Sequence, residues 1–303
     1  MNLTQEQVNR ALQRKRGQEK AKKILAKVFI YFMLLLIYAP LIYILFFSFT
    51  KHKILGQWNG FTLDNYKALF SISSNKDSAA LWKAIGNTAI VALLSATIST
   101  VLGTLGAIGI FYTRRKWVKN SLEFVNQIPV VNAEIVTAIS LCVLFVLTAR
   151  FLNLERSLFT VVLGHVVLSI PYVVLSVVPK LEQMDPSTYE AAMDLGATQT
   201  QALWKVVVPD IVPGILTGFL LSITLSLDDY VITAFTKPTT GGFDTLSTYV
   251  DNKIVKGGVP IQLRAFTAIL FGIILIVMIV MNLRSSRIAD KFKLLKKEEK
   301  AND

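Results

Sequence analysis

The chain has 303 residues, of which 53% are hydrophobic and 17% are charged, and it carries a net charge of +12 with a mean hydropathy of +0.52. This composition is too apolar for a soluble globular domain. The excess of Lys and Arg does not indicate a nucleic-acid-binding protein either, because the basic residues cluster in short stretches between apolar segments instead of forming one polar face.

Six apolar segments are long enough to cross a membrane, since about 20 apolar residues span a hydrocarbon core of about 30 Å. The sequence therefore predicts an all-α membrane protein with six transmembrane helices. In chain order, the expected spans are residues 24–49, 84–112, 128–149, 158–178, 211–235 and 265–283.

The basic stretches predict the topology of these spans. They lie before the first span, between the second and third, and after the sixth, within residues 10–27, 114–119 and 284–300. The positive-inside rule places all three in the cytoplasm, which agrees with an even number of crossings. We therefore expect a basic cytoplasmic N-terminal arm (1–23), a six-span membrane domain (24–283) and a basic cytoplasmic tail (284–303). The first apolar run is too long for a secretory signal, so we expect it to be retained.

Metal and thiol chemistry is not expected in this chain. Cys142 is the only cysteine, which excludes an internal disulfide and a cysteine-based metal cluster and favours a packing role. His52 and His165 are far apart in the sequence, and neither has the spacing of a metal-binding motif. We expect no metal site and no catalytic residue.

Small residues at four-residue spacing predict close contacts between helices. In the second span they are Ser95, Ser99, Gly103 and Ala107, and in the fifth span they are Gly214 and Gly218. Between the first two spans, residues 50–83 mix aromatic and polar residues. That segment either docks a partner or lies at the membrane interface, and its composition supports both interpretations equally.

The segment between the fourth and fifth spans (180–210) is acidic, unlike the other regions that the topology places in the cytoplasm. Asp185 and the proline after it predict a helix start, with Ser187 and Thr188 as possible caps. Gly196 is expected to end this helix. A second short helix over 199–208 is expected to stop at Pro209, which gives a helix–turn–helix shape.

The same segment carries the residues of a known motif. Glu190, Ala191, Ala192, Gly196 and, after nine further residues, Val206, Val208 and Pro209 resemble the EAA loop of ABC importer permeases. The strings at 61–70 and 86–88 also resemble this family. The resemblance implies the MetI-like type I importer fold. It also implies that the EAA loop (186–209) docks in a cleft of a separate ATPase subunit.

The family resemblance further implies the partners of the chain. These are a second homologous permease that forms a heterodimeric pore, two ATPase subunits, an extracytoplasmic substrate-binding protein and the lipid bilayer, with no nucleic acid. The chain has no GxxxxGK[ST] motif, so ATP and Mg are expected on the ATPase and no cofactor is expected on this chain. The long basic arm is expected to contact anionic lipid.

Three acidic residues lie within predicted spans: Glu134, Asp228 and Asp229. An Asp at the centre of a membrane helix costs about 2.5–3.5 kcal/mol, so each acid needs a reason to be there, and a wet cavity would tolerate it. Adjacent helical residues point about 100° apart, so one of the two aspartates is expected to line the path while the other pairs internally. The alternative is a helix cap or an ion pair with Lys237.

An acidic pathway favours cationic cargo, because carboxylates accept hydrogen bonds from desolvated ammonium groups. The strings at 133–141 and 226–235 resemble the second permease of spermidine/putrescine importers. This resemblance implies a polyamine cargo and a pathway formed by Glu134, Asp228, Asp229 and the adjacent Tyr230.

Other functions are compatible with parts of this pattern. A permease for iron, thiamine or another organic cation would keep the EAA loop. An ion-coupled secondary transporter would also use buried acids, but the EAA spacing and the absence of an inverted repeat in the sequence argue against it. A receptor or scaffold without transport gives no reason for acids within spans.

Overall fold

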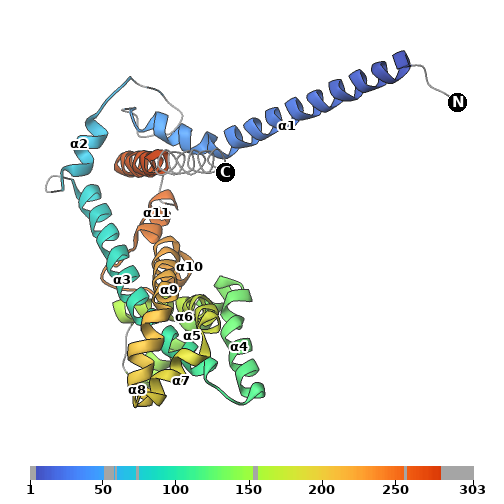
Figure 1. Cartoon of the computed structure of the whole chain (residues 1–303). Coiled ribbons are helices and arrows are strands. Elements are labelled where there is room, and N and C mark those ends of the chain that lie inside the picture. The colour runs from blue at the N-terminus through green and yellow to red at the C-terminus, as the bar shows by residue number, and fades with distance from the viewer. Residues whose placement is uncertain are drawn as a thin grey trace. The chain divides into compact units, whose positions relative to one another are not determined.

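The computed structural model describes residues 5–50, 58, 60–72, 75–152, 156–255 and 258–280, which are almost entirely helical (Figure 1). The helices are α1 (Gln5–Phe47), α2 (Asp64–Phe70), α3 (Lys76–Phe111), α4 (Lys116–Val131), α5 (Glu134–Leu152), α6 (Leu158–Gln183), α7 (Pro186–Asp194), α8 (Gln199–Ala202), a π-helix (Leu203–Val207), α9 (Val208–Asp228), α10 (Val231–Thr236) and α11 (Leu246–Val255). A last apolar helix covers Ile261–Val280. His52, the predicted tail and the end of the predicted sixth span lie outside the described residues.

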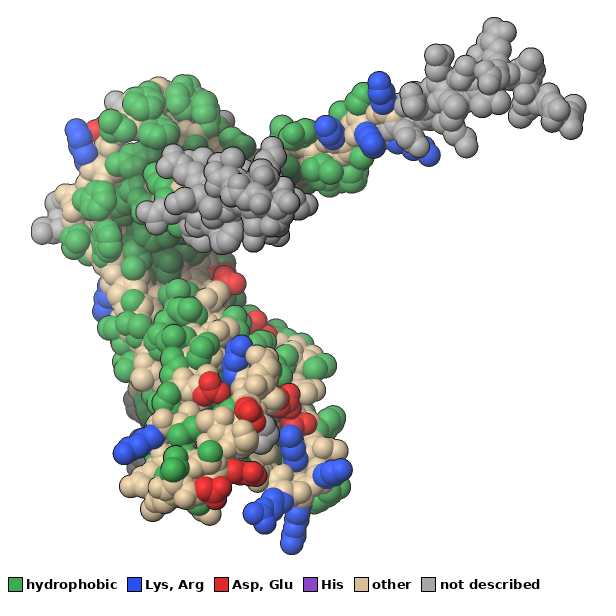
Figure 2. Space-filling model, in the orientation of Figure 1, with side chains coloured by type: hydrophobic (Ala, Val, Ile, Leu, Met, Phe, Trp, Pro, Cys, Tyr) green, Lys and Arg blue, Asp and Glu red, His purple; other side chains and the backbone are tan. Residues whose placement is uncertain are grey.

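Six of the described helices are long and apolar enough to cross a membrane, which confirms the prediction of six membrane helices. They are Lys22–Phe47, Lys76–Phe111, Glu134–Phe151, Leu158–Gln183, Gln199–Asp228 and Ile261–Val280. Large hydrophobic side chains are exposed along most of them, and hydrophobic side chains cover much of the face shown in Figure 2. Such a surface is stable only in contact with lipid or with other apolar helices.

The chain divides into two compact units. The terminal unit contains residues 1–78 and 258–303, and the core unit contains residues 79–257. In the terminal unit, the segment after α1 folds back through hydrogen bonds to backbone carbonyls: the Asn65 amide donates to Ser48 O at 2.6 Å and to Thr50 O at 2.8 Å. The rings of Phe49 and Phe61 stack with centroids 5.2 Å apart. These contacts give the string at 61–70 a structural role.

The predicted start of the third span was wrong. Residues 128–131 belong to α4, a separate helix with no buried residue, and the apolar helix begins only at Glu134. The two helices are separated because Asn132 has an extended backbone, with φ −72° and ψ 147°. The hydropathy pattern predicted one span here, because the apolar residues at the end of α4 are followed almost directly by those of α5.

The predicted fifth span was also wrong at its end. Instead of one helix over 211–235, α9 ends at Asp228, Asp229 takes an extended conformation, and α10 begins at Val231. Asp228 and Asp229 therefore do not lie on one continuous helix, and the angular argument made for a continuous helix does not apply to them.

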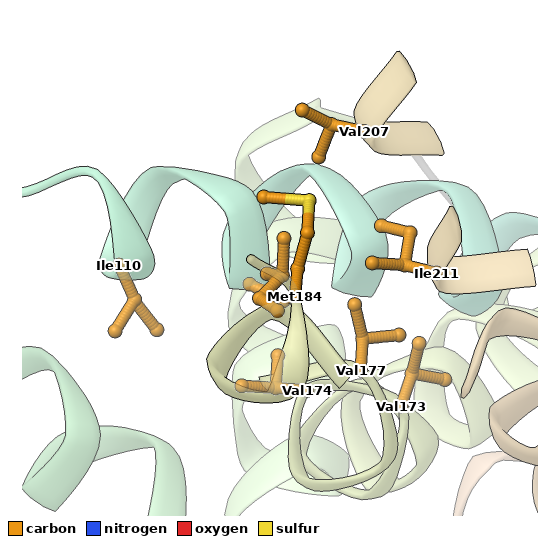
Figure 3. Packing of buried hydrophobic residues seen from close by; sticks show 9 residues of the cluster. Ile110, Val173, Val174, Val177, Met184, Val207 and Ile211 are labelled. Atoms are coloured by element: carbon orange, nitrogen blue, oxygen red, sulfur yellow. The ribbon is translucent and has the colours of Figure 1, made fainter. Parts of the chain in front are cut away.

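Close packing of α6 against α9 and α3 forms the interior of the core unit. A Cβ added at Gly214 would lie 2.9 Å from Ser176 O, one at Gly218 would lie 3.1 Å from Val173 Cα, and one at Gly103 would lie 2.7 Å from Val173 Cβ. The predicted small-residue contacts are thus present. Figure 3 shows the aliphatic cluster at this contact, with Val173 and Val177 close to Ile211.

Candidate functional site

The four residues predicted for the pathway all line one pocket of about 340 Å³ in the core unit: Glu134, Asp228, Asp229 and Tyr230. They come from the start of α5, the end of α9 and the break before α10. The remaining lining residues are Pro129, Val130, Asn132, Leu168, Tyr172, Thr224, Leu225 and Val231. The pocket therefore combines several carboxylates with aromatic and aliphatic walls.

Asp229 occupies the break between α9 and α10 and caps α10. Its Oδ1 accepts a hydrogen bond from the Ile232 backbone N–H at 3.0 Å, and its Oδ2 accepts one from the Thr233 backbone N–H at 2.9 Å. The Thr233 hydroxyl also donates to Oδ2 at 2.9 Å. A carboxylate on the first free N–H groups of a helix is a favourable cap. This contact explains why the chain leaves the helix at Asp229.

Asp228 and Glu134 are placed differently. Both side chains are exposed, whereas Asp229 is buried. The sequence-based expectation that one of the two aspartates pairs internally is met by Asp229. The alternative of a helix cap is also met, because Asp229 caps α10. The alternative pairing with Lys237 is wrong, because Lys237 Nζ lies 2.7 Å from Asp244 Oδ1.

Tyr230 lines the pocket while its hydroxyl donates to Asp251 Oδ2 on α11 at 2.9 Å. The loop before α11 is itself tied to α3. The Asn87 amide donates to Asp244 O at 2.9 Å, and the Leu246 N–H donates to Thr88 Oγ1 at 2.7 Å. The Asn and Thr of the string at 86–88 thus fix the segment that holds the Tyr230 hydroxyl.

His165 was not among the predicted site residues, yet it lies directly behind the pocket acids. Its side chain is 1% exposed, and Nε2 lies 2.9 Å from Thr233 Oγ1 and 3.3 Å from Asp229 Oδ2. Its Nδ1 lies 2.8 Å from Ser226 Oγ. A titratable residue within a membrane helix is itself a signal of function. The sequence argument tested His165 only for metal-ligand spacing, which it lacks. Among the described residues, no group of three or more His, Cys, Asp and Glu could hold a metal ion.

The EAA loop begins with α7, which is capped by local hydrogen bonds. The Asp185 carboxylate accepts from the Ser187 N–H at 3.0 Å, so Asp185 is the cap and the suggested Ser187 and Thr188 are not. This hydrogen bond holds the pKa of Asp185 below its usual value. At the other end, Gly196 has φ +87°, a left-handed conformation that favours glycine.

The predicted stop at Pro209 was wrong. After α8, a π-helix over Leu203–Val207 leads directly into α9, so the helix continues through Pro209. The Val208 N–H donates to Leu203 O, five residues earlier. Pro209 has no N–H to donate, and it is tolerated here because it directly follows the π-helix, where the regular pattern of hydrogen bonds to the fourth preceding residue is already interrupted.

The motif residues of the EAA loop are mostly at the surface. Glu190, Ala191 and Gly196 are exposed and Ala192 is half-buried, while Leu195 beside them is 90% exposed. Figure 2 shows Asp and Glu side chains around α7, whereas most of the Lys and Arg side chains at this end of the core unit lie beside the start of α4. The loop therefore presents both apolar and charged groups.

Comparison with protein families gives one match over most of the chain. Residues 99–291 match the family described as "Binding-protein-dependent transport system inner membrane component". Members are transport permeases of the inner membrane, which together with the six apolar helices identifies a multi-pass protein of the cytoplasmic membrane.

Curated relatives include two permeases of Escherichia coli (strain K12). The putrescine transport system permease protein PotI is 32% identical over 243 residues, covering 80% of this chain and 83% of the relative. The spermidine/putrescine transport system permease protein PotC is 32% identical over 246 residues, covering 80% and 87%. A PotC homolog of Mycoplasma genitalium is 26% identical over 271 residues, covering 86% and 89%.

Among solved structures, a bacterial ABC transporter that imports the acidic polysaccharide alginate has a TM-score of 0.65 at 18% identity, covering 88% of this chain and 97% of that one. A second structure, of an alginate ABC transporter in complex with a periplasmic protein that holds an alginate pentasaccharide, has a TM-score of 0.60, covering 88% and 93%. At this identity the likeness shows the fold, which is that of ABC transporter permeases.

Proposed function

Because this chain belongs to the family of binding-protein-dependent inner membrane transport components, we propose that it is the transmembrane permease subunit of an ATP-driven polyamine importer. In this proposal it forms half of the translocation pore and carries no catalytic residue. The observation that carries the proposal is the single pocket that collects Glu134, Asp228 and Tyr230, in a chain whose relatives include permeases named for putrescine and spermidine.

The composition of the pocket suits an alkyl chain with ammonium groups. The exposed carboxylates of Asp228 and Glu134 can accept hydrogen bonds from two ammonium groups, and such charge-assisted bonds are stronger than neutral ones. Tyr172, Tyr230 and Leu168 supply apolar walls for methylene groups, and tyrosine rings also attract cations. A polyamine has both kinds of group, whereas a bare metal ion would leave the aromatic walls unused.

The path from the EAA loop to the pocket supports mechanical coupling. α9 has 21 residues and is therefore about 30 Å long; the loop joins its first residues and Asp228 is its last. α9 packs closely on α6 through Gly214 and Gly218, and α6 ends directly before α7. A displacement of α7 by an ATPase subunit would thus move both helices together and act on the pocket.

The partners in this proposal follow from the family. They are a second homologous permease, two ATPase subunits that bind ATP and Mg, and an extracytoplasmic binding protein, with Glu190, Ala191, Ala192 and Gly196 at the ATPase contact. Both termini, with their basic residues, would lie in the cytoplasm. The domain limits remain the arm (1–23), the permease domain (24–283) and the tail (284–303).

ATP-dependent uptake by the reconstituted complex tests the proposal. The complex would be assembled in proteoliposomes with its own partner subunits and supplied with radiolabelled spermidine, putrescine, thiamine or ferric iron. We expect uptake of at least one polyamine, competition by the other, and none of the remaining two. Uptake of thiamine or iron without polyamine would reject the cargo and keep the permease. Uptake driven by an ion gradient without ATP would reject both.

A further inference from the structure

We propose that His165 is a positioning residue of the acidic pocket: it holds Asp229 and the α9–α10 break, so that Asp228 and Tyr230 are presented to the cargo. The nature of the cargo rests on the proposed function, but the contacts of His165 do not depend on it. The proposal also divides the pocket acids: the exposed carboxylate of Asp228 faces the cargo, Glu134 lines the pocket and hydrogen-bonds to Asp229, and the buried Asp229 acts behind them.

Asp229 is already occupied by donors from the protein. Its two oxygens receive the N–H groups of Ile232 and Thr233 and the hydroxyl of Thr233, and His165 Nε2 lies 3.3 Å from Oδ2. The side chain is 1% exposed. A carboxylate accepts about four hydrogen bonds, so little capacity is left for an ammonium group in the pocket.

His165 joins the elements that meet behind the pocket. It belongs to α6, and its ring contacts Ser226 of α9 through Nδ1 and Thr233 of α10 through Nε2. Ser226 Oγ in turn lies 3.2 Å from Ser95 Oγ of α3. A neutral ring satisfies every contact: Nδ1 accepts from Ser226, Nε2–H donates to Thr233, and the Thr233 hydroxyl donates to Asp229.

The backbone next to His165 is shaped for this contact. A Cβ added at Gly164 would lie 2.7 Å from Ile232 Cγ2 and 3.3 Å from Thr236 Cγ2. The absence of a side chain at position 164 therefore lets α10 approach α6 closely. Thr160 Oγ1 also donates to Thr236 O at 2.9 Å. This approach keeps Nε2 within reach of α10 and thus fixes the orientation of the helix that Asp229 caps.

Two variants and one control separate positioning from simple packing. His165→Leu fills the space without a donor, and His165→Gln keeps an amide donor. Ser169→Ala is the matched control, because Ser169 lies one turn further along α6, is fully buried and has no hydrogen-bond partner among the described residues. All three would be compared in the assembled complex, at equal amounts after size-exclusion chromatography.

The electrostatic field of the pocket can be measured without cargo. Thr224 lines the pocket and is exposed, so Thr224→Cys in a Cys142→Ser background gives one thiol there. The rates of labelling by a cationic and an anionic methanethiosulfonate reagent are measured for each variant, because an acidic pocket concentrates the cationic reagent. ATP-dependent polyamine uptake is measured in parallel in the natural-cysteine background.

We expect the cationic preference to fall several-fold in His165→Leu and uptake to fall about tenfold, with His165→Gln retaining most of both and Ser169→Ala unchanged. The proposal is overturned if His165→Leu keeps the preference of Ser169→Ala, or if His165→Gln loses as much as His165→Leu. If the unmodified complex takes up no polyamine, the proposed cargo fails, while the labelling ratio still decides the role of His165.

Discussion

The acidic pocket and the EAA loop are built in opposite ways. The pocket gathers residues that are far apart in the sequence, and a buried network through His165, Asp229 and Thr233 fixes the break at its edge. The EAA loop is one contiguous segment that is stabilised by local contacts, such as the Asp185 cap, and its motif residues are largely exposed.

The two regions also differ in how much apolar surface they leave exposed. The interior face of the pocket is satisfied by hydrogen bonds within the core unit. By contrast, the EAA loop leaves Leu195 90% exposed and Trp204 57% exposed. Exposed apolar residues beside a charged surface are typical of a protein interface. The pocket is therefore organised by the chain itself, whereas the EAA loop leaves apolar side chains exposed, as the proposed contact with an ATPase subunit requires.

The largest expected effect breaks the helix pair that joins the two regions. Gly218→Leu would place side-chain atoms where a Cβ already lies 3.1 Å from Val173 Cα. Overpacking of this kind costs about 1–3 kcal/mol or more, and a backbone atom cannot move aside as a side chain can. We expect little assembled complex in detergent by size-exclusion chromatography. Thr217→Leu, at an exposed neighbouring position, should assemble normally; equal losses would contradict the packing argument.

A second test acts on the EAA loop alone. Gly196→Val forces a β-branched residue into the left-handed conformation at φ +87°, at a cost of about 1–2 kcal/mol that the loop can relieve by changing shape. Because Gly196 is exposed, assembly should be retained while uptake falls more than about tenfold. ATP hydrolysis and uptake would be measured together. Gly196→Asn should lose less, since Asn tolerates this conformation; equal uptake in both variants would argue against a shape requirement.

A third test acts on the pocket alone. Asp228→Asn removes one exposed carboxylate of the pocket. A hydrogen bond to a charged group is worth about 1.5–3 kcal/mol, so uptake should fall by about tenfold or more if the cargo contacts this residue as proposed. ATP hydrolysis in the absence of cargo should stay unchanged. Asp228→Glu keeps the charge and should recover part of the uptake. If Asn and Glu behave alike, the charge of this residue is not what the cargo contacts.

The smallest expected effect concerns the helix cap of α7. Asp185→Ala removes the acceptor for the Ser187 N–H, while Asp185→Asn keeps one. Because the folded carboxyl has a lowered pKa, its contribution is present at neutral pH and is lost only in acid, as pH falls through that lowered pKa. We expect a slight reduction of uptake in the Ala variant at neutral pH and almost none in the Asn variant. A large loss in both would assign Asp185 a direct contact.

The sequence predicted the contiguous features of the molecule well. Six apolar helices, the small-residue contacts of Gly214 and Gly218 and the helix over α7 all follow from local patterns. The four predicted pathway residues share one pocket, although their role stays a prediction. Features of this kind can be predicted from one segment alone, without knowing which distant segments contact it.

Some of the missed features depend on contacts between distant segments, and others on a break of one or two residues within an apolar stretch. The break at Asp229 exists because its carboxylate caps α10 and lies next to His165. A hydropathy average over many residues does not detect such a short break. The separation of α4 from α5 is likewise a matter of two residues, Asn132 and Ala133, within a long apolar stretch. The position of His165 beside Asp229 could not be predicted without knowing that α6 and α10 pack closely at Gly164.

The π-helix over Leu203–Val207 places one extra residue in the helix that leads into α9. In a continuous α-helix, an extra residue would turn everything after it by about 100°, whereas a π turn holds one more residue than an α turn and so absorbs most of that rotation. Gly214 and Gly218 can therefore face α6 although the segment before them is one residue longer than an α-helical path needs. Deleting one residue from 203–207 should leave this packing in place, whereas inserting one into the regular helix after Val208 should turn both glycines away from α6.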